Sequence, residues 1–220
     1  MTHPIDRRRV LAAGAALGAA TALAPALTGT AHAAPAPRAA AWTGKRTANG
    51  WPVLEQAQEF TVEGSGRRVR LAAGPAAVLL LHVARRFHYE IAELRADDLD
   101  GHTRNRTVGQ RYESNHLSGT ALAIRPAAYP TGVKDGLYPR ELVVVRDILA
   151  ELEGTVAWGG DFRTPKESHF QLAHGPGDRR LTAVAARIEG WNAGPGGVGA
   201  GATDAFAPER RARARAFARS

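Results

Sequence analysis

The chain has 220 residues, no cysteine and a formal net charge of +8 at pH 7. The absence of cysteine excludes disulfides, thiol nucleophiles and thiolate metal sites, so the fold has to rest on its core. Basic residues are not interleaved with aromatic ones, so we predict no nucleic-acid binding.

The first 33 residues predict an export signal. Arg7-Arg8-Arg9-Val10-Leu11 opens an apolar run of small residues, and Ala31-His32-Ala33 follows it as a cleavage signal. Paired arginines before an apolar run are typical of the twin-arginine route, which exports folded proteins. We therefore expect a secreted or cell-wall associated protein with no stable membrane span. An uncleaved N-terminal anchor is the alternative.

Composition divides the rest of the chain into three parts. Residues 34–50 are rich in Ala, Pro and Arg without a period, which predicts a flexible linker. Residues 51–192 are long enough for one domain with its own core, and we expect a monomer. Residues 193–220 are rich in Gly, Ala and Arg, which predicts a disordered tail. The arginines of this tail suit an anionic wall polymer as partner, or form only a solvated terminus.

The predicted elements of the domain mix strands and helices. Two alternating segments, 59–62 and 68–71, flank Glu63-Gly64-Ser65-Gly66 and predict a hairpin. Apolar residues at helical spacing predict helices over 76–94, 139–152 and 179–191. Further strands are predicted at 119–124, 155–158 and 169–172. This mixture of separate strands and helices favours an α+β fold.

Three segments carry a recognisable pattern: Ser114-Asn115-His116-Leu117-Ser118-Gly119-Thr120-Ala121-Leu122-Ala123, Trp158-Gly159-Gly160-Asp161 and Ser168-His169-Phe170. Together they resemble the Hedgehog-like superfamily of D-alanyl-D-alanine carboxypeptidases and L-alanyl-D-glutamate endopeptidases. The motifs of that superfamily run S-x-H-x-x-G-x-A-x-D, then W-G-G, then D/E-x-x-H-F. The resemblance covers residues 101–172. It implies a small central antiparallel sheet flanked by helices, with a zinc cleft across the sheet.

The resemblance also implies a zinc site made by two histidines and an aspartate. By motif position, His116 and His169 are the metal ligands, and Ser114 belongs to the substrate-binding residues beside His116. Relatives hold a substrate carboxylate with an upstream arginine, for which Arg106 is the first match and Arg104 the second. Either arginine could instead be a solvated strand residue.

Two positions depart from the superfamily pattern. Ala123 stands where the aspartate ligand is expected, and a methyl group cannot bind zinc. Glu113, Glu167 or His174 would have to replace it as a ligand. Lys166 stands where the catalytic acid is expected, and Glu167 beside it is the candidate general base. A surface glutamate in a turn is the alternative for Glu167.

These features leave two main functions open. The first is an exported zinc peptidase that hydrolyses peptidoglycan stem peptides, with Glu167 activating water. The second is a non-catalytic pseudo-peptidase that binds wall peptide or a protein partner. A secreted structural domain whose motif residues only hold the fold is a third reading.

Overall fold

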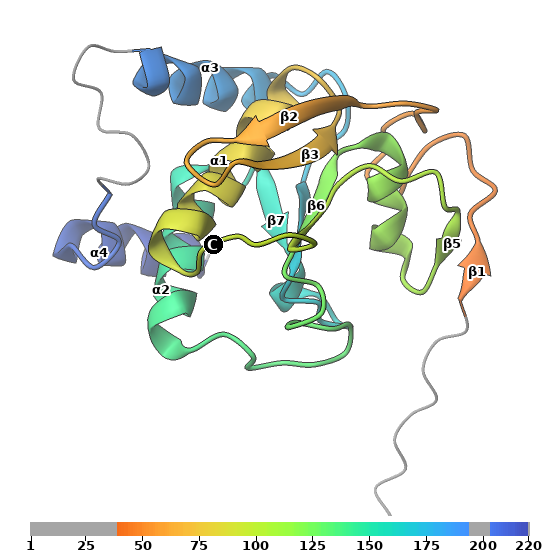
Figure 1. The fold of residues 1–220 in the computed structure, drawn as a ribbon. Coiled ribbons are helices and arrows are strands. Elements are labelled where there is room, and N and C mark those ends of the chain that lie inside the picture. The colour runs from red at the N-terminus through yellow and green to blue at the C-terminus, as the bar shows by residue number, and fades with distance from the viewer. Residues whose placement is uncertain (1–38, 194–202, 220) are drawn as a thin grey trace, which may run out of the picture. The chain divides into compact units, whose positions relative to one another are not determined.

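The computed structural model describes residues 39–193 and 203–219 (Figure 1). Its strands are β1 (Ala40–Ala41), β2 (Gln58–Val62), β3 (Arg67–Leu71), β4 (Leu99–Asp100), β5 (Thr107–Val108), β6 (Ala121–Ile124), β7 (Val156–Trp158) and β8 (His169–Leu172). Its α-helices are α1 (Pro75–Glu90), α2 (Pro139–Glu151), α3 (Arg179–Ala193) and α4 (Pro208–Phe217). Two short 3₁₀ helices are η1 (Arg111–Ser118) and η2 (Gly159–Asp161).

A four-stranded antiparallel sheet forms the centre, in the order β4-β6-β8-β7. All four residues of β6 are buried, so this strand is covered on both faces. That explains why its sequence is a continuous apolar run rather than an alternation. β2 and β3 form the predicted hairpin as a separate sheet. Antiparallel strands and separate helices together confirm the α+β class.

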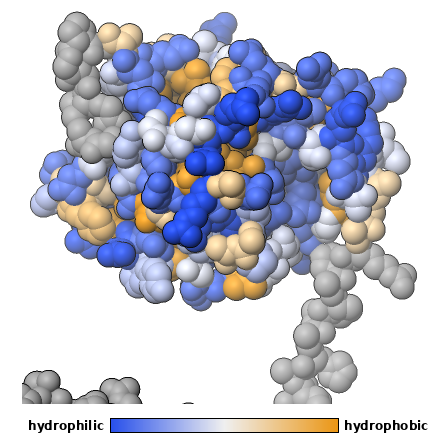
Figure 2. All heavy atoms as spheres, in the orientation of Figure 1, coloured by the Kyte–Doolittle hydropathy of each residue, from blue (hydrophilic) through white to orange (hydrophobic). Residues whose placement is uncertain are grey.

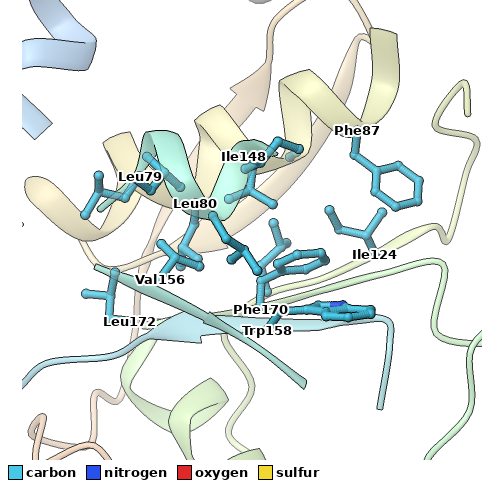
Figure 3. Packing of buried hydrophobic residues seen from close by; sticks show 14 of the residues in the cluster. Leu79, Leu80, Phe87, Ile124, Ile148, Val156, Trp158, Phe170 and Leu172 are labelled. Carbon is cyan, nitrogen blue, oxygen red and sulfur yellow. The ribbon is translucent and has the colours of Figure 1, made fainter. Parts of the chain in front are cut away.

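The core lies between the central sheet and the helices that pack on it. Leu80 and Phe87 of α1 extend toward Phe170 of β8 and Ile124 of β6 (Figure 3), and Leu79 of α1 belongs to the same core cluster. These five side chains are at most 1% exposed. Leu80 and Phe87 lie at the helical spacing that predicts this helix, so this part of the core follows from sequence periodicity.

α1 is shorter than predicted. It ends at Glu90 instead of Leu94, because the amide of Leu94 turns back and donates to His88 Nδ1 at 3.0 Å. Its start agrees with the sequence, since Pro75 occupies the first turn, where a missing N–H has no cost. Helix ends are set by such local hydrogen bonds more than by the apolar period.

The predicted linker over residues 34–50 differs from the structure, which describes residues 39–50 as part of the fold. β1 pairs with β5, and the amides of Ala48 and Asn49 donate to Ser114 Oγ and Asn115 Oδ1. Polar side chains of η1, far away in sequence, therefore order a segment that has no apolar period of its own. Residues 34–38 lie outside the described residues.

The predicted disordered tail over residues 193–220 also differs, because residues 208–217 form α4 beside α2 (Figure 1). The Arg210 guanidinium donates to the buried carboxylates of Asp147 and Glu151 on α2. These acids have no visible link to the tail in the sequence. Residues 194–202 lie outside the described residues.

The predicted signal peptide, residues 1–33, also lies outside the described residues. Within the described part of the chain, no helix is both long and apolar enough to cross a membrane. On the face shown in Figure 2, hydrophilic residues predominate and apolar ones lie between them.

Candidate functional site

His116 and His169, distant in sequence, lie against each other. η1 carries His116 and β8 carries His169, and their ring centroids are 5.2 Å apart at an interplanar angle of 69°. Two imidazoles that share a tetrahedral ion, with Zn–N of about 2.0–2.1 Å, have ring centres about 5 Å apart. His169 is fully buried and His116 is 8% exposed. The structure therefore brings together the two histidines that the motifs single out.

A chain of hydrogen bonds fixes the tautomer of His169. The backbone amide of Asn49 donates to Asn115 Oδ1, so Asn115 Nδ2 faces Gln171 and donates to its Oε1 at 2.7 Å. The same Oε1 lies 2.9 Å from His169 Nε2, which must then carry the proton and donate. This leaves His169 Nδ1 unprotonated, buried and without a hydrogen-bond partner among the described residues.

The tautomer of His116 is fixed in the same manner. Its Nδ1 lies 2.9 Å from the carbonyl oxygen of Gly101, which can only accept, so Nδ1 carries the proton. His116 Nε2 keeps its lone pair and has no hydrogen-bond partner within the described residues. One N–H held by an acceptor and one free lone pair is the arrangement of a metal-ligating histidine.

Both imidazoles are neutral near pH 7. Burial lowers the pKa of His116, the hydrogen bond to Gly101 opposes this in part, and the charge of Lys166 lowers it further. Burial lowers the pKa of His169 well below 6.5, and His116 and Lys166 add to the effect. Neutral rings keep their lone pairs available to a ligand.

A polar cavity of about 620 Å³ opens beside His116. Its wall includes Asp100, Ala123, Glu113 and Lys166. In the sheet register, Ala123 lies between Asp100 of β4 and His169 of β8. Directly opposed residues of antiparallel strands project from the same face, so Ala123 leaves room where an aspartate would point at the pair.

Glu167, the predicted catalytic base, has another role. Its Oε1 accepts from the amide of Asp135, and its Oε2 accepts from the amides of Gly136 and Leu137, at 2.9–3.0 Å. The side chain is 7% exposed and does not line the cavity. The geometry contradicts the prediction of a base: in the turn that leads into β8, Glu167 points to the loop before α2, whereas Lys166 lies on the cavity wall.

Lys166 forms an ion pair inside the cavity wall. Its Nζ lies 2.8 Å from Glu113 Oε1, and the two side chains are 17% and 19% exposed. Burial disfavours the charged form of Glu113, but the hydrogen bond and charge of Lys166 and the amides of Gln110 and Gly109 outweigh it, so its pKa is lowered. Glu113 is thus a paired anion and also caps η1.

Three predicted substrate-binding residues lie elsewhere. Ser114 is fully buried, donates to the Arg111 carbonyl and accepts from Ala48, so it joins η1 to the N-terminal segment. Arg106 donates to the carbonyls of Trp42 and Gly44 at 3.3 and 3.4 Å, across the β1–β5 pair. Neither of these residues lines the cavity, and the third, Arg104, does not line it either.

Arg104 is exposed, and no described residue forms a hydrogen bond or ion pair with its side chain. His174, a possible substitute ligand, instead neighbours Asp178 and Arg180. On the loop between β4 and β5, Thr103 and Asn105 line the cavity and Arg104 and Arg106 do not, so spacing in sequence does not identify the residues that face it.

Arginines on β3 line the cavity instead. Arg68 and Arg70 share the face opposite the buried Val69 and Leu71, and both form ion pairs with Glu59. The alternation that predicts the hairpin already contains this signal, since it puts both arginines on one face. Only the three-dimensional approach of the hairpin to β4 shows that this face meets the cavity.

The glycines of the second motif shape the turn that carries Lys166. A Cβ on Gly159 would lie 2.3 Å from the Lys166 carbonyl oxygen, and one on Gly160 would lie 2.3 Å from the Trp158 ring. Trp158 Nε1 donates to the Glu167 carbonyl at 2.7 Å. The motif therefore holds the segment from Lys166 to His169 tightly against η2.

The donor set does not fit a catalytic zinc ion. Such a site uses three protein ligands, and here only two imidazoles remain. Among the described residues, no group of three or more His, Asp or Glu side chains could hold a metal ion. Comparison with known proteins adds no assignment: no protein-family model, curated protein or solved structure matches this chain.

Proposed function

We propose that this protein is an exported, peptidoglycan-directed relative of the Hedgehog-like zinc peptidases that binds cell-wall stem peptides without hydrolysing them. The carrying observation is the His116–His169 pair beside a polar cavity in which the groups needed for hydrolysis are replaced or occupied. Export by the twin-arginine route and a monomeric state belong to the proposal on the sequence features alone.

The histidine pair supports descent from a metal site. Each ring is oriented by a hydrogen bond to one nitrogen, while the other nitrogen keeps its lone pair. A fold that needed these histidines only for packing would gain little from leaving a buried nitrogen without a partner, since this costs about 1–3 kcal/mol.

The surroundings of the pair support a loss of hydrolysis. A zinc peptidase needs a third ligand and a base that takes the proton of the bound water. Ala123 offers no ligand, and both oxygens of Glu167 accept from backbone amides. Glu113 is neutralised by Lys166.

The walls of the cavity support a carboxylate-bearing ligand. Arg68, Arg70 and Lys166 contribute cations to a hollow large enough for a short peptide segment. Stem peptides carry free carboxylates, which arginine recognises through paired hydrogen bonds. In this proposal Arg68, Arg70 and Lys166 hold the ligand carboxylate, the role first predicted for Arg106 and Arg104.

One observation favours hydrolysis as a second candidate function. Asp100 is exposed, lines the cavity and lies opposite Ala123, so its carboxylate stands one strand away from the expected ligand position. An aspartate there could serve as a base for a water molecule in the cavity.

The test is to incubate the mature protein with a synthetic stem pentapeptide, with and without zinc, and to follow binding by calorimetry and cleavage by mass spectrometry. We expect saturable binding and intact peptide. Arg70→Gln should weaken binding about fivefold, as expected for a partly exposed ion pair, and the exposed Arg140→Gln should not. Cleavage that is lost in Asp100→Asn would favour the second candidate, and absence of binding would contradict the proposal.

A further inference from the structure

We propose that Lys166 is the resident cation of the cavity, taking over the charge of a metal ion, keeping divalent metals out and binding a ligand carboxylate. The identity of the ligand rests on the proposed function. The exclusion of metal rests on the geometry of Lys166, Glu113 and the histidine pair.

Hydrogen bonds hold both the backbone and the side chain of Lys166 in place. Its amide donates to the Gly159 carbonyl at 3.0 Å, and its own carbonyl accepts from the His169 amide at 2.9 Å. Its Nζ is fixed by Glu113 at 2.8 Å. Because the backbone is locked three residues before His169, the ammonium has a defined position on the wall that also contains His116.

The charge of Lys166 opposes a second cation. A divalent ion at the histidine lone pairs would meet a fixed positive charge on the same wall and would have only neutral protein ligands. Glu113, an acid on the cavity wall that could balance such an ion, is already neutralised by Lys166. The ammonium and the dication therefore compete for the same carboxylate.

The ammonium of Lys166 also has N–H donors left over for a ligand. An ammonium has three N–H donors, and Glu113 is the single acceptor for this one among the described residues. The Lys166 side chain is 17% exposed, so ligand atoms can reach it. Two donors and a positive charge in a partly buried site suit the terminal carboxylate of a peptide.

Zinc titration followed by thermal unfolding tests the exclusion of metal. The proteins are wild type, Lys166→Met and the matched control Lys134→Met, which changes an exposed lysine outside the cavity. We expect zinc to raise the melting temperature of Lys166→Met and to leave wild type and Lys134→Met unchanged, because stabilisation follows binding to the folded state. If zinc raised the melting temperature of wild type as much as that of Lys166→Met, the inference would be overturned.

The two histidines alone could bind zinc too weakly to detect even when Lys166 is removed. The same comparison is therefore repeated in a variant with a third ligand. Ala123→Asp restores a third ligand on the strand beside His169. In that background Lys166→Met should raise zinc affinity at least about tenfold, whereas Lys166→Arg, which keeps the charge, should not. No effect of Lys166→Met on zinc binding in either background would overturn the inference.

A peptide pair tests the carboxylate. We expect Lys166→Met to weaken binding of a stem peptide acid about tenfold and to leave binding of its C-terminal amide unchanged. Equal losses for both peptides would overturn this role of Lys166. If wild type binds neither peptide, the proposed function fails, while the zinc titration still decides the exclusion of metal.

Discussion

At the scale of single residues, neighbours in sequence take opposite roles. Lys166 faces the cavity, and Glu167 turns to the loop before α2, where three backbone amides surround its carboxylate. Loss of this acceptor would leave the buried amide of Leu137 and the amides of Asp135 and Gly136 without a partner, which is costly, so Glu167 contributes to stability rather than to chemistry at the histidine pair.

Glu167→Gln should therefore destabilise the domain by about 2 kcal/mol, because an amide oxygen is a weaker acceptor than a carboxylate and the amide nitrogen cannot accept at all. Urea unfolding measures the loss. Glu93→Gln, at an exposed glutamate, serves as the control and should change stability by less than about 0.5 kcal/mol. A Glu167→Gln protein of normal stability that has lost a peptidase activity would restore the catalytic role.

The sequence predicted part of this site. The motifs identified His116 and His169 as a pair, and the structure brings their rings together. The roles of Ser114 and Arg106 could not be predicted, because both bind the N-terminal segment and nothing in the sequence links that segment to η1. Polar contacts between segments far apart in the chain leave no periodic pattern in the sequence, so they cannot be predicted from it.

At the scale of secondary-structure elements, apolar periodicity predicted the main core helices and strands, whereas charge pairing holds α4, which was not predicted. Asp147 and Glu151 are buried on α2 and face Arg86 of α1, which is itself fully buried. Arg210 of α4 supplies a second cation to both acids. From sequence alone an arginine-rich tail is predicted to be solvated, because its acidic partners lie far away in the chain.

Arg210→Ala should destabilise the domain by about 3 kcal/mol, since removal of one partner leaves buried carboxylates undercompensated. Arg211→Ala is the matched control on the same helix, because Arg211 is exposed and no described residue pairs with it. Denaturant unfolding of both variants provides the comparison. Equal stability of the two would mean that the ion pairs of Arg210 with Asp147 and Glu151 contribute nothing to stability.

At the scale of the whole molecule, the buried histidines predict how stability depends on pH. Folding lowers the pKa of His116 and His169 below 6.5, so the unfolded chain binds more protons below that value. The stability linked to these rings is full above about pH 6.5 and is lost as pH falls, by about 1.4 kcal/mol per pH unit for each ring.

Thermal unfolding between pH 7.5 and 5.5 should therefore show a falling melting temperature. His116→Asn should reduce the slope by about one proton, because it removes one of the three buried histidines whose pKa folding lowers, the third being His82. An unchanged slope in this variant would mean that His116 is protonated in the folded protein as readily as in the unfolded chain.

The central claim is that the cavity binds stem peptide without a metal ion. The most direct measurement is a calorimetric titration of stem pentapeptide into protein treated with a chelator, repeated after addition of zinc. The account predicts the same affinity in both titrations, because Arg70 and Lys166 supply the positive charge. Binding that disappears in chelator and returns with zinc would contradict it.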